Sequence, residues 1–111
     1  MTESPQPADS ETDVADASGS RGDVQLETEL FRVTRWTIAP GGAIPEHRHD
    51  FPYVVVPLVT GTMHVVNADG SEIQADLEFG VSYTRPAGAV HRVENRGSDA
   101  DIVFVETERL A

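Results

Sequence analysis

Short runs of alternating apolar and polar residues, separated by turn residues, fill the sequence from about residue 30 to its end. In the run 30–38, LFRVTRWTI, Trp36 and Ile38 fall on one face and Val33 on the other. Further runs of this kind cover 44–49, 53–58, 62–67, 71–77, 81–85, 90–95 and 101–107. No segment of ten or more residues has an apolar period of 3.6 residues. We therefore predict an all-β fold, a sandwich or a barrel.

The dipeptide Asp69-Gly70 lies between the runs 62–67 and 71–77 and predicts a β-hairpin. We expect a type I′ turn there, in which both central residues have positive φ.

The first part of the chain differs in composition from the rest. All aromatic residues lie between Phe31 and Phe104, and residues 1–23 carry six acidic side chains against Arg21. Such a segment buries too little apolar surface to offset the entropy lost on ordering. We predict a single domain over 25–111, preceded by a disordered acidic tail over 1–24.

Composition excludes several kinds of function. The chain has no cysteine, which removes thiol nucleophiles, disulfides and thiolate metal sites. Its net charge of −11 argues against a nucleic-acid partner, which needs a concentrated positive surface. No run of 18 apolar residues and no signal-peptide pattern is present. We expect a cytoplasmic protein with no membrane or nucleic-acid partner.

Three of the four histidines are spaced as metal ligands would be. His47 and His49 form an H-x-H pair, and residues two apart on a strand point to the same face. His91 follows a turn at the start of another predicted strand. Three imidazoles from two strands can bind one metal and leave coordination positions open.

Two segments resemble the sequence motifs of the cupin superfamily, and the resemblance covers residues 30–107. The second motif, G-x5-P-x-G-x2-H-x3-N, is matched at Gly80, Pro86, Gly88, His91 and Asn95. The first motif is matched at Gly41, His47, His49 and Gly61. The chain is also similar to small bacterial cupins associated with β-alanine degradation. The resemblance implies a double-stranded β-helix (a jelly-roll, RmlC-like barrel) with His47, His49 and His91 as metal ligands.

The sequence departs from the first motif at the position of its glutamate ligand. Counting from His49 and from Gly61 places Val54 there, and valine cannot bind a metal. We expect Tyr53 to point away from the site unless a bulge turns it inward. The expected centre has three neutral imidazoles completed by water, around Fe, Zn, Mn or Ni. Such a centre keeps the full charge of the metal and favours an anionic small-molecule ligand.

Four further residues are candidates for a catalytic or binding role, although each also fits a surface or packing role. Tyr53 or Tyr83 could donate a proton, Arg85 could anchor a carboxylate, and His64 could act as a general base. We assign Asn95 and the motif glycines structural roles in turns.

Several functions remain open at this point. The first is a metal-dependent enzyme of dioxygenase, lyase or isomerase type, acting on a small metabolite that carries a carboxylate. The second is a non-catalytic module that binds a metal or a metabolite, and the third is a scaffold that has lost its metal with the glutamate. We expect a homodimer, with the segment 30–38 as an edge strand at the contact.

Overall fold

The computed structural model describes residues 18–97 and 99–111. Within these residues the chain forms nine strands and no helix, and so no helix in them could cross a membrane. The strands are β1 (Ser20–Glu27), β2 (Phe31–Ile38), β3 (Ala43–Arg48), β4 (Tyr53–Pro57), β5 (Gly61–Asn67), β6 (Glu72–Leu77), β7 (Tyr83–Arg85), β8 (Val90–Glu94) and β9 (Ile102–Arg109).

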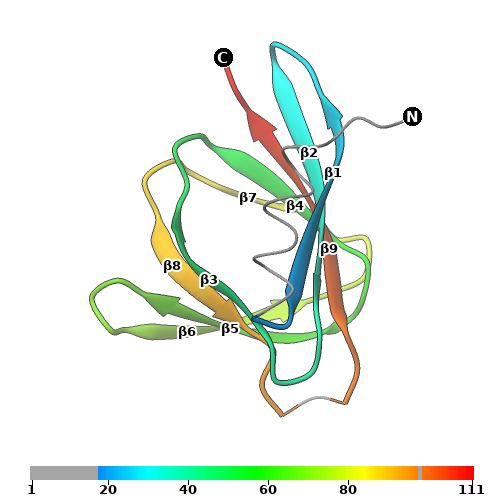
Figure 1. Cartoon of the computed structure of the whole chain (residues 1–111), viewed down its shortest axis with the longest axis vertical. Helices are drawn as coiled ribbons and strands as arrows, with labels where there is room; N and C mark the ends of the chain where they lie inside the picture. Colours follow the sequence, from blue (N-terminus) through cyan, green and yellow to red (C-terminus); the bar gives the residue numbers. More distant parts are fainter. Residues whose placement is uncertain (1–17, 98) are drawn as a thin grey trace.

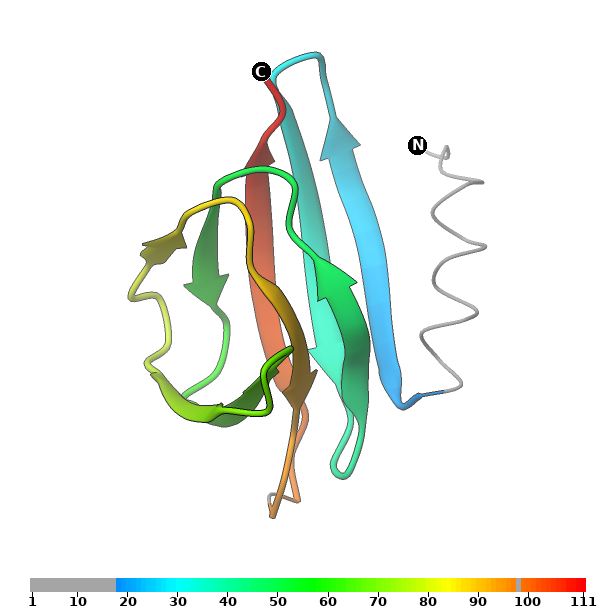
Figure 2. The same ribbon diagram turned by 90° about the vertical axis from the view of Figure 1, so that its left-hand side faces the viewer.

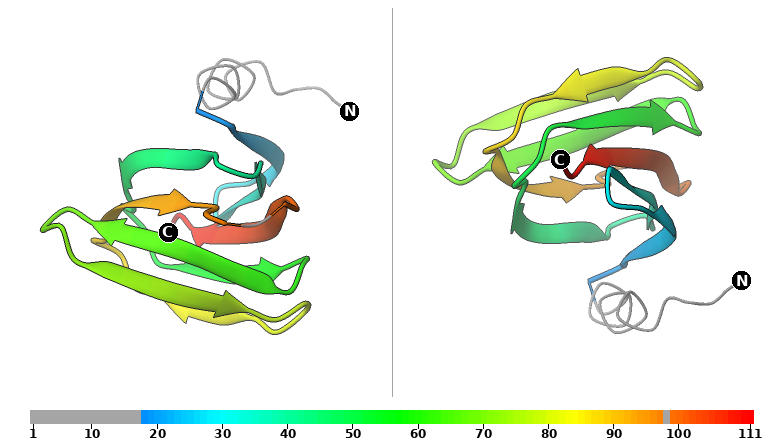
Figure 3. Two further views of the ribbon diagram at one scale, coloured as in Figure 1. Left: turned by 90° about the horizontal axis from the view of Figure 1, so that it is seen from below. Right: turned by 90° about the horizontal axis from the view of Figure 1, so that it is seen from above.

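The strands form two antiparallel sheets that face each other (Figures 1 and 2). One sheet has the order β1-β2-β9-β4-β7 and the other the order β3-β8-β5-β6. Figure 3 shows the pair along its long axis, with β9 packed opposite the second sheet. Consecutive strands frequently cross between the sheets, so β3 and β8, which are distant in sequence, become neighbours.

The core lies between the sheets and is built from the inward positions of both. Its buried apolar members are Ile38, Ile44, Tyr53, Val55, Met63, Leu77, Val93, Ile102 and Phe104. Alternation along β9 illustrates the pattern, because Ile102 and Phe104 are buried whereas Val103 and Val105 point the other way. The all-β prediction is confirmed.

Strand β1 was not among the predicted strands, whereas a strand forms at each predicted run. It begins at Ser20, inside the segment that we assigned to the tail, so residues 20–24 belong to the sheet. Residues 1–17 of the predicted tail lie outside the described residues. The inward side chains of β1 are small, which is why its apolar alternation is weak.

The expectation that the segment 30–38 is an edge strand is wrong. Strand β2 pairs with β1 on one side and with β9 on the other. Ile38 is consequently fully buried and Trp36 packs against the core. The segment 30–38 was expected at an edge because β1, its neighbour on one side, was not predicted.

The β5–β6 hairpin forms where Asp69-Gly70 predicted it, but its turn is not of type I′. Within this loop only Gly70 has a positive φ, of 89°, because no non-glycine residue in the described chain, Asp69 included, has one. The Gly70 N–H donates to the Asn67 carbonyl at 2.9 Å, and the Asp69 carboxylate accepts from the Ser71 N–H at 2.9 Å. A longer loop with glycine at the left-handed position replaces the two-residue turn.

Asn95 has the structural role that we predicted for it. It is 1% exposed, and its side-chain amide donates to the carbonyls of Ile38 at 3.0 Å and Ala100 at 2.9 Å. The side chain thus ties the end of β8 to the end of β2 and to the loop before β9.

Candidate metal centre

The antiparallel pairing of β3 and β8 brings the three histidines together. His47 of β3 is directly opposite His91 of β8 in the register. His49 is the first residue after β3, and its backbone lies beside the turn before β8. There its N–H donates to the Ala89 carbonyl at 2.9 Å, and its carbonyl accepts from the Gly88 N–H at 2.7 Å.

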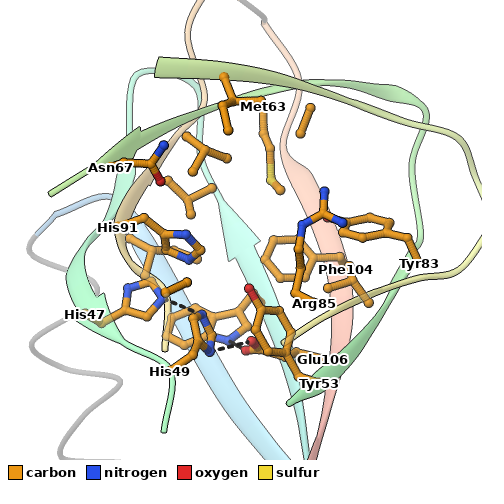
Figure 4. Close-up of a pocket in the computed structure, with 18 of the residues that line it drawn as sticks. His47, His49, Tyr53, Met63, Asn67, Tyr83, Arg85, His91, Phe104 and Glu106 are labelled. Carbon is orange, nitrogen blue, oxygen red and sulfur yellow. Dashed lines mark hydrogen bonds and ion pairs between the residues drawn. The ribbon is translucent and has the colours of Figure 1, made fainter. Parts of the chain in front are cut away.

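The three imidazole rings converge on one point (Figure 4). Their centroids are 4.7 Å apart for His47 and His49, 4.9 Å for His47 and His91, and 5.0 Å for His49 and His91. One ring nitrogen from each histidine lies within 4.8 Å of the other two. Among the described residues no aspartate or glutamate joins this group.

The donor set fits a divalent transition metal. The Nε2 atoms of His47 and His49 are 3.0 Å apart. Two metal–nitrogen bonds of about 2.0–2.1 Å at tetrahedral to octahedral angles place their nitrogens roughly 2.9–3.4 Å apart. The Nδ1–H of His47 donates to the Pro45 carbonyl at 2.8 Å, which leaves the Nε2 lone pair for a metal.

Burial keeps two of the imidazoles neutral. Burial and the neighbouring His47 and His91 lower the pKa of His49 to about 3. Burial, followed by His47 and Arg85, lowers the pKa of His91 to about 4. Both rings therefore present free lone pairs at neutral pH, as metal binding requires.

The orientation of β4 is opposite to the one that we expected. Tyr53 points inward, is 6% exposed and stacks on His49 with ring centroids 4.0 Å apart, whereas Val54 is 41% exposed. The strand pairs regularly with both neighbours, so no bulge is involved. Counting along the motif had placed the inward position one residue too late, and a tyrosine occupies the inward position.

The histidines line a cavity of about 270 Å³ between the sheets. Its walls are mostly apolar, with Val55, Met63, Val65 and Phe104 among them. Arg85 is the only lysine or arginine, and Glu106 the only acidic residue, among the described residues of the lining. A ligand bound beside the histidines would meet one positive charge.

Three of the four further candidates lie at this cavity. Tyr53, Tyr83 and Arg85 line it (Figure 4). The Cζ atom of Arg85 lies 4.7 Å from the centroid of the Tyr83 ring, and its Nη1 donates to the Thr84 carbonyl at 3.0 Å. Burial raises the pKa of both phenols, so both tyrosines remain protonated near neutral pH.

His64 does not belong to this site. Its neighbours Met63 and Val65 line the cavity, so the side chain of His64 points to the other face of β5. There its Nε2 accepts from the Gln74 side-chain amide at 3.2 Å.

Two polar residues that line the cavity were not predicted from the sequence, Asn67 of β5 and Glu106 of β9, and only Glu106 is acidic. Glu106 is also the one whose carboxylate lies beside a histidine ring nitrogen. It is 7% exposed, and its Oε2 lies 3.5 Å from Nδ1 of His49. Burial, followed by the charge of Glu108, raises the pKa of Glu106 to about 7. Alternation in the run 101–107 could have identified it, because Glu106 shares a face with Ile102 and Phe104.

Comparison with known proteins agrees with this fold. The family model described as "Cupin domain" matches residues 34–107. The chain is 44% identical over 85 residues to a β-alanine degradation protein, BauB, of Pseudomonas aeruginosa, covering 77% of this chain and 87% of that protein.

Solved structures show the same architecture. A cupin domain from Bordetella pertussis aligns with a TM-score of 0.79 and 44% identity over 84% of this chain and 95% of that one. An RmlC-like cupin with a double-stranded β-helix fold from Methanocaldococcus jannaschii aligns with a TM-score of 0.67 and 17% identity, over 85% of this chain and 83% of that one. The predicted double-stranded β-helix is confirmed, and the chain belongs to the cupin superfamily.

Proposed function

We propose that this protein is a metal-dependent cupin enzyme, of dioxygenase, lyase or isomerase type, acting on a small metabolite that carries a carboxylate. The observation that carries the proposal is the convergence of His47, His49 and His91 at the wall of a cavity that also contains Arg85. The three histidines would hold Fe, Zn, Mn or Ni. The bound metal would act as a Lewis acid or would activate a small ligand in its open positions.

The size and charge of the cavity support a small anionic substrate. A volume of about 270 Å³ lies just below the usual range for sites that bind drug-sized molecules. Three neutral ligands leave the charge of a metal uncompensated, so a carboxylate is attracted to the same place. The guanidinium of Arg85 can hold a carboxylate through paired hydrogen bonds.

The other residues of the cavity have separate roles in this proposal. The ring of Tyr83 supports the guanidinium of Arg85 and so orients the substrate. The protonated phenol of Tyr53 can donate a proton or a hydrogen bond next to His49. The apolar side chains keep water away from the reacting atoms. The relative named for β-alanine degradation supports a small metabolite from amino-acid breakdown.

The test combines metal analysis with a panel of compounds. Protein purified without chelators is reconstituted with Fe(II), Mn(II), Ni(II) or Zn(II) and incubated with small thiols, diketones and β-amino acids, with the amides of the acids as matched controls. We expect the protein to convert a carboxylate-bearing compound and not its amide. Product formation and oxygen consumption measure this turnover.

Two outcomes would contradict the proposal. Binding of such compounds without any turnover would identify a non-catalytic module that binds metal and metabolite. Less than about 0.1 equivalent of bound metal after reconstitution would show that the histidines do not form a metal site.

We also propose that the protein is a homodimer. Because β2 lies inside its sheet, the contact between the two copies cannot form along the edge of β2. The outward face of β2, β9 and β4 takes its place, since Val33, Val105 and Val54 point away from the core there.

A further inference from the structure

Glu106 lies behind His49, on the opposite side of the ring from the other two histidines. Nε2 of His49 is 3.0 Å from Nε2 of His47, whereas Nδ1 of His49 is 3.5 Å from Oε2 of Glu106. Figure 4 shows this arrangement, with Glu106 and Tyr53 on the side of His49 away from His91. The carboxylate therefore faces the nitrogen that does not point to the metal position.

The other oxygen of Glu106 is fixed by a tryptophan. Nε1–H of Trp36 donates to Oε1 at 3.0 Å. The indole can reach this position because residue 22 is glycine. A Cβ atom at Gly22 would lie 2.8–3.0 Å from three atoms of the Trp36 ring, closer than such atoms approach. Strand β1 thus seats the indole, and the indole orients the carboxylate.

The protonation of a histidine ligand explains why a carboxylate beside Nδ1 matters for metal binding. If Nε2 of a neutral imidazole provides the lone pair for the metal, Nδ1 must carry the hydrogen. A buried N–H needs an acceptor, and the acceptor decides which way the ring turns. For His47 this acceptor is the Pro45 carbonyl at 2.8 Å. For His49 the facing group is Glu106.

We propose that Glu106 is a positioning residue of the metal centre, which accepts the Nδ1–H of His49 and so presents Nε2 to the metal. Glu106 is not itself a ligand, because only His47, His49 and His91 form the group that could hold the metal among the described residues. This inference rests on the metal site of the proposed function.

The choice of variant follows from the geometry. Glu106 lines both the central cavity and a second cavity of about 420 Å³ beside β1 and β2, so truncation to alanine would join the two spaces. Glu106→Gln keeps the volume. A carboxylate offers an acceptor oxygen to each of its two donors, Trp36 and His49, whereas a glutamine offers one oxygen and turns an N–H toward the other donor.

Glu108→Gln is the matched control. It removes the same charge from the same strand two residues away, where Glu108 accepts from Nε of Arg32 at 2.8 Å and is absent from the central cavity. Trp36→Phe is a second test variant that leaves Glu106 in place but removes the donor to its Oε1.

The experiment measures the affinity of each variant for Co(II) and Zn(II) by competition with a chelator, together with the visible absorption spectrum of the Co(II) form. We expect Glu106→Gln to weaken binding about 10- to 100-fold and to change the Co(II) spectrum. Trp36→Phe should change the metal affinity and the Co(II) spectrum in the same direction as Glu106→Gln, but by a smaller amount. The metal affinity of Glu108→Gln should stay within about twofold of that of the wild type. Melting of the metal-free proteins reports the fold separately.

The outcomes separate this inference from the proposed function. If the wild type binds metal and Glu106→Gln binds it equally well with an unchanged Co(II) spectrum, the role of Glu106 is refuted. An equal loss in Glu108→Gln would also refute it, because the effect would then be one of charge at a distance. If the wild type binds no metal, the metal site itself is refuted. If Glu106→Gln does not fold, unchanged affinity and spectrum in Trp36→Phe would overturn the proposal.

Discussion

The three histidines have the same side chain but are held in different ways. Strand register places His47 opposite His91, so backbone pairing alone brings these two rings together. His49 lies beyond the end of β3, and side chains hold its ring: Tyr53 on one face and Glu106 at Nδ1. Its position therefore depends on β4 and β9, strands of the opposite sheet.

Removing one ligand should abolish tight metal binding. We expect His91→Ala to lower bound metal from about one equivalent to a small fraction, because two imidazoles alone bind weakly. Elemental analysis after dialysis measures the change. His64→Ala is the control, since it removes the same side chain from the outer face of β5. Equal metal content in the two variants would contradict the assigned ligand set.

Arg85 should decide how strongly a carboxylate binds. A charge-assisted hydrogen bond contributes about 1.5–3 kcal/mol, so Arg85→Gln should weaken binding of a short carboxylate roughly 10- to 100-fold. Isothermal titration calorimetry of the metal-loaded protein measures this. Arg92→Gln is the control, because Arg92 pairs with Glu94 at 2.7 Å and does not line the cavity. If Arg92→Gln caused the same loss, the effect would reflect overall charge.

The sequence predicted the histidines but not the groups that hold them. The ligands could be found because their spacing is local, with one residue separating His47 from His49 and a turn preceding His91. Glu106 comes from β9, and its approach to His49 depends on how the two sheets face each other. Tyr53 was assigned the wrong side because counting along the motif placed the inward position at Val54, and only the three-dimensional structure shows that Tyr53 is the buried one.

At the level of strands, alternation predicted those that bury large side chains. It failed for β1, which pairs along β2 yet turns small residues such as Gly22 inward. The contribution of this strand is a flat surface for Trp36 and a row of backbone hydrogen bonds. Neither feature produces an alternation of apolar residues in the sequence. Strands of this kind can therefore be identified only when the position of the strand that they pair with is known.

The β5–β6 hairpin depends on one glycine. Gly70 has a φ of 89°, and an L side chain pays about 1–2 kcal/mol there, so Gly70→Ala should lower the free energy of unfolding by roughly that amount. Denaturant unfolding measures it. Gly61→Ala is the control, because Gly61 has no positive φ and nothing within 4 Å of an added Cβ. An equal loss in both variants would show that the φ of Gly70 is not the cause.

For the whole molecule, the two faces of the five-stranded sheet differ. The inner face holds Tyr53, Phe104 and Glu106 around the cavity. On the outer face, register aligns Val33 with Thr107 and Thr107 with Val54 across three strands. Within the described residues both sheets are single layers, so no strand covers this face. A protein with a net charge of −11 repels its copies, and association therefore favours a contact with few charges.

A homodimer through this face can be tested with a single added charge. Sedimentation velocity should give twice the chain mass of 12.0 kDa for the wild type. Val54→Asp should shift the protein to a single chain, because two copies of the carboxylate would meet at a symmetric contact. Val81→Asp is the control, since Val81 is 53% exposed in the loop between β6 and β7. A wild type that sediments as one chain would contradict the dimer, and a Val54→Asp variant that remains dimeric would place the contact elsewhere.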